Sequence, residues 1–236
     1  MKQKITMKYI LKTTALALFL MSATISNAQT LVIDDFDSYG DTAALQTNWN
    51  SFGTAASSGA PTLAAGEGVS GSNAAKFSLN WFDGNNANMR RINLTNLDLS
   101  SYDFLDISLY VETDVGNVSP TVPTILKVAF QSSDGTIWQT SLSFAQEPNV
   151  DSYSLLSFEL SESMMQRTNG SGSFSSTITD ITNIRLRFEN SQESNVGQTA
   201  FISSIAASTI PEPSSYALGF GVMMIGTVLL IRRKRS

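Results

Sequence analysis

The sequence predicts an all-β fold, a β-sandwich, for residues 29–209 of this 236-residue chain. Apolar and polar residues alternate over short runs, which is the spacing of half-buried strands. Turn signals separate these runs, and Asp134-Gly135 between two of them predicts a tight hairpin. Sustained helical spacing is absent, apart from a weak pattern around Ser161–Arg167. Many short antiparallel strands in one domain imply two packed sheets, each with one face in the core and the other wet.

Each predicted strand places its apolar residues on one face. In chain order these residues are Ala75, Phe77, Leu79 and Trp81; Leu105, Ile107, Leu109 and Val111; Leu126, Val128 and Phe130; Trp138, Leu142 and Phe144; Leu156, Phe158 and Leu160; Ile184, Leu186 and Phe188. Segments rich in Gly, Ala, Ser and Thr, at Ala55–Gly71 and Gly170–Thr177, predict long loops.

The N-terminus has the pattern of a secretory signal peptide over residues 1–28, with a helical apolar core. Four lysines precede the apolar run Ala15–Met21, and Ser26-Asn27-Ala28 supplies small residues at the −3 and −1 positions of a cleavage site. The sequence therefore predicts export of the body.

The C-terminus predicts one transmembrane helix over residues 216–231. The uncharged stretch Ser214–Ile231 has 18 residues, and at about 1.5 Å per residue it reaches roughly 27 Å, enough to cross a bilayer core. The basic tail, residues 232–236, contains Arg232, Arg233, Lys234 and Arg235. By the positive-inside rule such a tail stays cytoplasmic, which places the body on the other side of the membrane.

The tail resembles the PEP-CTERM sorting signal of exopolysaccharide-producing Gram-negative bacteria. The resemblance rests on Pro211, Glu212 and Pro213 in the linker 210–215, followed by the span and the basic cluster. It implies an exosortase-type processing enzyme as a partner, which removes the span and delivers the body to the cell surface or the extracellular matrix of a biofilm. An ordinary single-span membrane anchor is the alternative.

The charge of the body excludes some partners. Eight of the 15 basic residues lie in the two end segments, whereas of the 20 acidic residues only Glu212 does, so residues 29–209 carry seven basic and 19 acidic side chains. Because such a surface repels phosphate backbones, no nucleic-acid partner is expected.

The chain contains neither cysteine nor histidine. These absences exclude disulfides, thiolate nucleophiles, catalytic triads with histidine and most transition-metal sites. A carboxylate pair or an oxygen-ligated metal is the chemistry that remains. We therefore expect a non-catalytic protein, with a carboxylate-dependent glycosidase as a minor alternative.

The body resembles the galactose-binding-like jelly rolls that occur as carbohydrate-binding modules. The resemblance rests on the order of five segments: Val32–Asp37, Leu97–Ile107, Leu126–Trp138, Asp151–Leu160 and Ile181–Asn190. It implies a jelly-roll β-sandwich and polysaccharide as a partner. In the last strand of such modules an Asp pair is usual, whereas this chain has Ser203-Ser204.

A cluster of aspartates suggests a structural Ca²⁺ site and no other cofactor. Asp34, Asp35 and Asp37, together with Asp41, could offer several oxygens to a hard cation. Alternatively, Asp34 and Asp35 are solvated or accept hydrogen bonds from turn amides.

A sugar site needs aromatic platforms and planar polar groups. Trp49, flanked by polar residues, is either a loop platform or a plug for the end of the sandwich, and Phe82 at a turn is equally ambiguous. Wet-face positions predicted from the alternation are Tyr110, Lys127, Gln131, Arg185 and Arg187. The two arginines either bind hydroxyls or uronic-acid carboxylates, or pair with acids of neighbouring strands such as Glu112 or Glu159.

From the sequence we therefore expect an exported surface or matrix protein whose sandwich binds polysaccharide. A structural or protein-interaction role without glycan binding is the second hypothesis.

Overall fold

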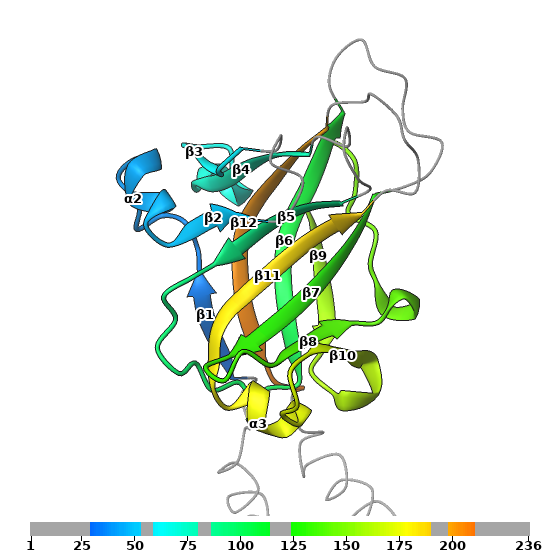
Figure 1. The fold of residues 1–236 in the computed structure, drawn as a ribbon. Coiled ribbons are helices and arrows are strands. Elements are labelled where there is room, and N and C mark those ends of the chain that lie inside the picture. Colours follow the sequence, from blue (N-terminus) through cyan, green and yellow to red (C-terminus); the bar gives the residue numbers. More distant parts are fainter. Residues whose placement is uncertain (1–28, 53–58, 80–85, 114–123, 190–197, 211–236) are drawn as a thin grey trace, which may run out of the picture. The chain divides into compact units, whose positions relative to one another are not determined.

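The computed structural model describes residues 29–52, 59–79, 86–113, 124–189 and 198–210 (Figure 1). Residues Thr30–Thr209 form one compact unit. The predicted signal peptide, sorting motif, transmembrane helix and basic tail lie outside the described residues, as does Phe82. None of the helices in the described part of the chain is long and apolar enough to cross a membrane.

The described strands form two antiparallel sheets. Sheet A has the spatial order β3 (Thr62–Ala64), β4 (Ala74–Leu79), β12 (Gln198–Ser208), β6 (Phe104–Thr113) and β9 (Ser154–Glu159), with β1 (Thr30–Asp34) also paired to β12. Sheet B has the order β10 (Met165–Asn169), β8 (Ile137–Thr140), β7 (Ile125–Ser132), β11 (Ile181–Glu189), β5 (Asn86–Arg91) and β2 (Trp49–Ser51).

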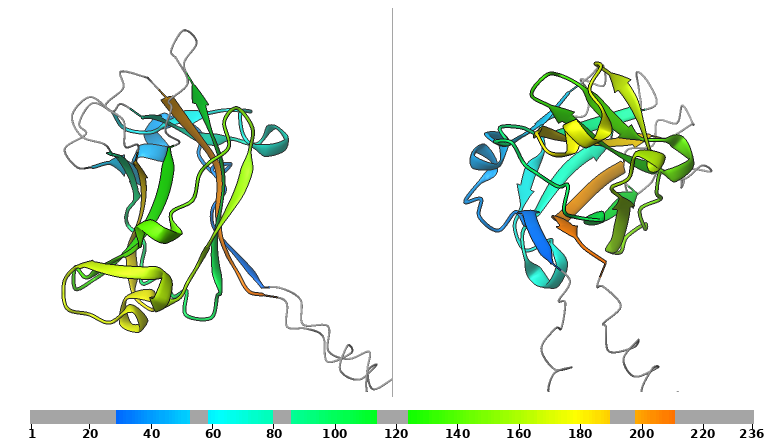
Figure 2. Two further views of the ribbon diagram at one scale, coloured as in Figure 1. Left: turned by 90° about the vertical axis from the view of Figure 1, so that its right-hand side faces the viewer. Right: turned by 90° about the horizontal axis from the view of Figure 1, so that it is seen from below.

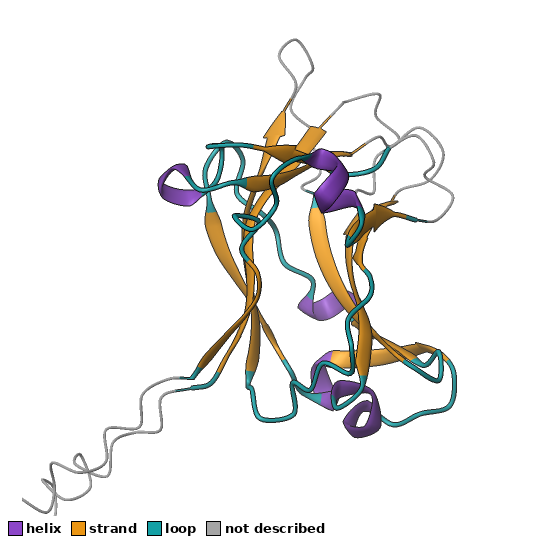
Figure 3. Ribbon diagram, turned by 90° about the vertical axis from the view of Figure 1, so that its left-hand side faces the viewer, coloured by secondary structure: helices purple, strands orange, loops and turns teal. Residues whose placement is uncertain are grey.

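The two sheets face each other as a sandwich, and the short helices lie at its ends and edges (Figures 2 and 3). Between β4 and β12 the chain crosses repeatedly from one sheet to the other, which is the path of a jelly roll. The predicted all-β sandwich is confirmed.

The core lies between the sheets and consists of the apolar faces that the alternation predicts. Phe77 of β4 and Phe188 of β11 meet across the core, with ring centroids 6.3 Å apart. Fully buried residues from the predicted strands include Leu79, Leu105, Ile107, Leu109, Leu126, Val128, Phe130, Ile184 and Leu186. Burial of these side chains provides the main driving force for the fold.

A bulge in β12 interrupts the strand alternation. The register against β6 shifts between Ile202 and Ser204, so Ile202 and Ile205, three residues apart, both face the core. The hydroxyl of Ser203 accepts a hydrogen bond from the backbone of Val69, at 3.0 Å. Ser203, one of the two serines at the position of the expected Asp pair, thus ties the segment around Val69 to the sheet.

The predicted hairpin at Asp134-Gly135 is confirmed, because β7 and β8 pair on either side of it. The Asp134 carboxylate accepts hydrogen bonds from the Ser132 hydroxyl, at 2.5 Å, and from the Thr136 backbone, at 2.8 Å. These bonds hold the pKa of Asp134 below its usual value.

Three local predictions are wrong. The strand after the hairpin ends at Thr140, and the chain turns into the 3-10 helix η3 (Leu142–Phe144), which leaves Leu142 exposed. The weak helical pattern at Ser161–Arg167 forms the short η4 (Glu162–Met164) and then β10, because pairing with β8 outweighs local propensity. The expected loop Gly170–Thr177 contains the start of α3 (Phe174–Ile178), which is capped by Ser173.

Two short elements occur in the N-terminal half. The helix α2 (Thr42–Gln46) is capped by the Asp41 carboxylate, which accepts from the Ala44 backbone at 2.8 Å. The 3-10 helix η2 (Val69–Gly71) and β3 both lie in the segment expected to be a long loop.

Candidate functional site

The outer face of sheet B carries polar and charged side chains from several strands, and we call it the sheet B face. Alternation along β5, β7 and β11 turns every second residue away from the core, so these side chains share one surface. The sheet B face includes Asn50, Phe52, Asn88, Arg90, Lys127, Ala129, Gln131, Gln139, Asn183, Arg185, Arg187 and Glu189.

Strand register arranges these residues in rows across the sheet. Asn50, Arg90, Arg185, Ala129 and Gln139 lie opposite one another on successive strands. A second row contains Asn88, Arg187 and Lys127. Guanidinium and amide groups thus lie side by side, and such groups can hydrogen-bond to the hydroxyls and carboxylates of a ligand.

Arg185 lies near the middle of the sheet B face and is half-buried. Its guanidinium donates a short hydrogen bond to the Gln131 side chain, whose amide oxygen also accepts from Asn183 at 3.4 Å. The carbon atom of this guanidinium lies 4.8 Å from the centroid of the Phe52 ring. Burial, and then the charge of neighbouring Arg90, lower the pKa of Arg185.

The second predicted arginine, Arg187, belongs to an ion-pair cluster. Its Nε atom lies 2.6 Å from one oxygen of Glu189, and Lys127 Nζ lies 2.6 Å from the other oxygen. The expected acid partners were Glu112 or Glu159, but both lie on sheet A. That part of the prediction is wrong, because an acid two residues along the same strand is nearer.

Tyr110 does not join this face, because β6 belongs to sheet A. Its ring stacks on Phe201 at 4.9 Å with an interplanar angle of 4°, and meets Tyr153 edge-on at 4.8 Å. The rings of Tyr110 and Phe201 border a hollow of about 480 Å³ whose polar lining includes Glu67, Lys76 and Glu112. Burial, and then the nearby Glu112 charge, raise the pKa of Tyr110. The predicted site residues are therefore divided between the two sheets.

Trp49 is fully buried, so it is a plug and not a platform. Its ring packs against Phe36 at a centroid distance of 5.6 Å, and its Nε1 donates to Asp34 Oδ2 at 2.8 Å. The same carboxylate accepts from the Tyr39 hydroxyl at 2.7 Å. Its Oδ2 also lies 3.3 Å from Arg91 Nε. We call Asp34, Tyr39, Trp49 and Arg91 the Asp34 network.

The Asp34 network and the neighbouring turns account for the predicted calcium ligands. Asp34 Oδ1 accepts from the Phe36 backbone at 3.0 Å, so both of its oxygens are engaged by the protein. Asp35 accepts from the Asp37 backbone at 3.2 Å, and Asp37 from the Asn73 backbone at 2.7 Å. No group of three or more acidic side chains placed to hold a metal occurs among the described residues. The alternative in which these aspartates accept from backbone amides fits this geometry.

Burial and the contact with Asp34 also affect Tyr39. Burial first, and then the hydrogen bond to Asp34, raise the pKa of Tyr39 to about 12. The phenol therefore stays protonated and continues to donate to the carboxylate across the physiological pH range.

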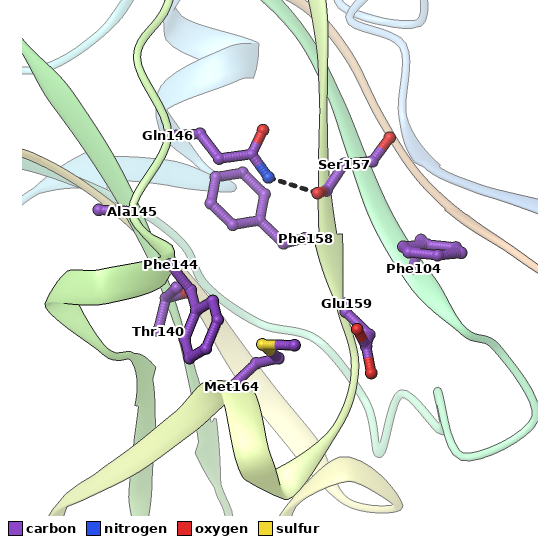
Figure 4. Close-up of a pocket in the computed structure, with 9 residues that line it drawn as sticks. All are labelled: Phe104, Thr140, Phe144, Ala145, Gln146, Ser157, Phe158, Glu159 and Met164. Atoms are coloured by element: carbon purple, nitrogen blue, oxygen red, sulfur yellow. Dashed lines mark hydrogen bonds between the residues drawn. The ribbon is translucent and has the colours of Figure 1, made fainter.

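A further hollow, of about 350 Å³, lies between the edges of the two sheets (Figure 4). Phe144 and Met164 line one side, and Phe158 of β9 lines the other. Among the nine described residues that line it, Glu159 is the one acid. Because glycoside hydrolysis needs two carboxylates, these residues do not form such a site.

Sequence reasoning missed Phe52 and Arg90. In β5, Ala87 and Met89 are buried and alternate with Asn88 and Arg90, so the same period-two rule could have found this strand. Phe52 directly follows β2, and nothing in its neighbours along the chain indicates that its ring contacts two arginines.

Fold and surface together define a β-sandwich with a polar, guanidinium-rich sheet face. No protein-family model matches the sequence, and the curated proteins give no significant match. Solved structures do resemble it, among them the family 11 carbohydrate-binding module of cellulase Lic26A-Cel5E from Clostridium thermocellum. That module has 16% identity and a TM-score of 0.48, over 77% of this chain and 95% of the module.

Two other similar structures are a second carbohydrate-binding module and an enzyme. A non-crystalline-cellulose-specific family 28 carbohydrate-binding module has 16% identity and a TM-score of 0.46, over 68% of this chain and 86% of that one. An exo-β-agarase has 11% identity and a TM-score of 0.51, over 78% of this chain, which spans about a quarter (26%) of the agarase chain. At these identities the likeness concerns the fold alone.

Proposed function

We propose that the protein is an exported, non-catalytic polysaccharide-binding protein of the cell surface or extracellular matrix, and that the sheet B face is its binding surface. The observation that carries the proposal is the set of adjacent guanidinium and amide side chains across β5, β11 and β7. These groups match the hydroxyls of a sugar chain, and Phe52 adds an aromatic surface among them.

The small number of carboxylates on the sheet B face supports a non-catalytic role. Among the described residues of the sheet B face, Glu189 is the one carboxylate, and it is engaged by Lys127 and Arg187. A glycosidase needs one carboxyl group as acid and a second as base or nucleophile. The hollow on sheet A has two glutamates, Glu67 and Glu112. If the protein released reducing ends from a polysaccharide and Glu112→Gln abolished this activity, the non-catalytic part of the proposal would be overturned.

The two sheets can be distinguished by one pair of substitutions. We expect Gln131→Ala to weaken binding to a polysaccharide about tenfold, because it removes an amide from the face and the partner of Arg185. Tyr110→Ala on sheet A is expected to leave the affinity unchanged. Affinity electrophoresis of the full-length chain in gels containing each polysaccharide measures both effects. The opposite pattern would move the site to sheet A, and no retardation in any gel would favour the structural role.

We also propose that the C-terminal segment directs sorting by an exosortase-type enzyme, on the basis of Pro211, Glu212, Pro213 and the basic cluster Arg232–Arg235. Intact-mass analysis of the protein recovered from the cell surface is then expected to show a chain without residues 216–231. Glu212→Ala is expected to leave the chain uncut and in the membrane fraction. A surface protein that keeps residues 216–231 would favour the simple anchor.

A further inference from the structure

Positive charge is concentrated on the sheet B face of a protein whose body is strongly acidic. Residues 29–209 carry seven basic and 19 acidic side chains. Four of the seven basic residues, Arg90, Lys127, Arg185 and Arg187, lie on this one face. Glu189 is the one acid among the described face residues. This face is therefore positive although the surrounding body is negative.

The charge is also unevenly balanced within the face. Glu189 neutralises part of the charge of Lys127 and Arg187, with both contacts at 2.6 Å. Arg90 and Arg185 lie directly opposite each other on β5 and β11. Neither has a carboxylate within 4.0 Å in the described part of the chain. Like charges directly opposite across two strands are unfavourable for the folded protein, so this pair has no evident structural benefit.

Neutral groups hold the two guanidinium groups in place around one aromatic ring. Arg90 Nε donates to Asn50 Oδ1 at 3.3 Å, and Arg185 donates to Gln131. The carbon atoms of the guanidinium groups lie 5.1 Å (Arg90) and 4.8 Å (Arg185) from the Phe52 ring centroid. Contact with the ring orients the guanidinium groups, and neither positive charge has a carboxylate counterion among the described residues.

We infer that Arg90 and Arg185, supported by Phe52, bind a carboxylate of the ligand, so the substrate class is an acidic, uronate-containing polysaccharide. This inference rests on the function proposed above and names the ligand class of the same face. A guanidinium group binds a carboxylate through two parallel hydrogen bonds. Two such groups beside each other supply both the charge and the geometry that a uronate needs.

Neutral amide groups beside the two arginines favour a polysaccharide over a nucleic acid as the anionic ligand. A uronate-containing polysaccharide has its charges on sugar rings and offers hydroxyls as well, which the amides of Asn183 and Gln131 on the same face can bind.

The test compares each acidic polysaccharide with its carboxyl-reduced form, in which the uronic acids become neutral hexoses with unchanged linkages. Alginate, polygalacturonate and xanthan serve as probes, and affinity electrophoresis of the full-length chain gives the dissociation constants. We expect at least one acidic form to bind, and its reduced form to bind at least about tenfold more weakly. Added NaCl should weaken the binding of the acidic form.

The variants Arg90→Gln and Arg185→Gln are each expected to weaken binding of the acidic form by about 10- to 100-fold, because each removes a hydrogen bond to a charged group. Lys76→Gln, which removes one positive charge from sheet A, is the matched control and should bind like the wild type. Thermal unfolding of Arg185→Gln should occur near the temperature of the wild type, because relief of the like-charge pair offsets the lost contacts with Gln131 and Phe52.

Each other result has a defined meaning. Equal binding of acidic and reduced forms would overturn the inference and leave the proposed function intact. The inference would also be overturned if Lys76→Gln weakened the binding of acidic forms and the two arginine variants did not. Binding of no form of any probe would count against the proposed function as well.

Discussion

Replacing Asp34 by alanine is expected to lower the free energy of unfolding by about 3–5 kcal/mol, because one partner of a buried ion pair is removed. The Asp34 carboxylate is almost fully buried and lies 3.3 Å from Arg91 Nε. It also accepts hydrogen bonds from Tyr39, Trp49 and the Phe36 backbone, at 2.7 to 3.0 Å. Without it, a guanidinium charge and three polar groups lose their partner in the interior. Urea unfolding at pH 7, followed by far-UV circular dichroism, measures the loss.

Asp35→Ala is the control for this prediction. Asp35 is the neighbouring residue, is exposed, and accepts one hydrogen bond from the Asp37 backbone. Its replacement should cost less than about 1 kcal/mol. If both variants lowered the free energy of unfolding by the same small amount, the Asp34 network would not contribute to stability as predicted.

Replacing Trp49 by alanine is expected to cost about 3–5 kcal/mol as well, because it leaves a cavity where a large, fully buried side chain was. The ring fills the space beside Phe36, with centroids 5.6 Å apart, and its Nε1 donates a hydrogen bond to Asp34. Trp49→Phe keeps most of the packing and loses one hydrogen bond to a charged group, so it should cost about 1.5–3 kcal/mol. The same urea titrations give both values.

The Trp49→Phe variant also tests the assignment of this residue to the core. At a temperature where the variant is folded, its affinity for polysaccharide should equal that of the wild type. A loss of more than about tenfold with an unchanged far-UV spectrum would restore Trp49 as a sugar platform. A double substitution with Asp34→Ala should cost less than the sum of the two single effects, because the two residues share a contact.

The core of the sandwich could be predicted from the sequence because a strand exposes alternate residues to opposite faces. Residues such as Phe77, Ile107, Phe130 and Leu186 are buried as their alternation predicts. The same rule predicted correctly that Arg185 and Gln131 face outward. It could not predict that Tyr110 lies on the other sheet, because alternation gives the face of a strand and not the sheet to which the strand belongs.

The candidate site was less predictable than the core. Phe52 and Arg90 are separated by more than 30 residues in the chain and approach each other only because β2 pairs with β5. Arg185 is brought to them by the pairing of β11 with β5. Trp49 was ambiguous because its sequence neighbours are polar, whereas its surroundings in the fold, including Phe36 and Asp34, are determined by tertiary packing.

The sequence by itself determined the core strands β4, β6, β7, β9 and β11, the position of the hairpin at Asp134-Gly135 and the excess of acidic residues, because these follow from local periodicity, turn chemistry and composition. Tertiary structure alone decided that Asp34 is a buried hydrogen-bond acceptor and that Arg90 and Arg185 lie side by side around Phe52. The physical reason is that both arrangements depend on strand register, and register is set by the joint burial of residues far apart in the chain.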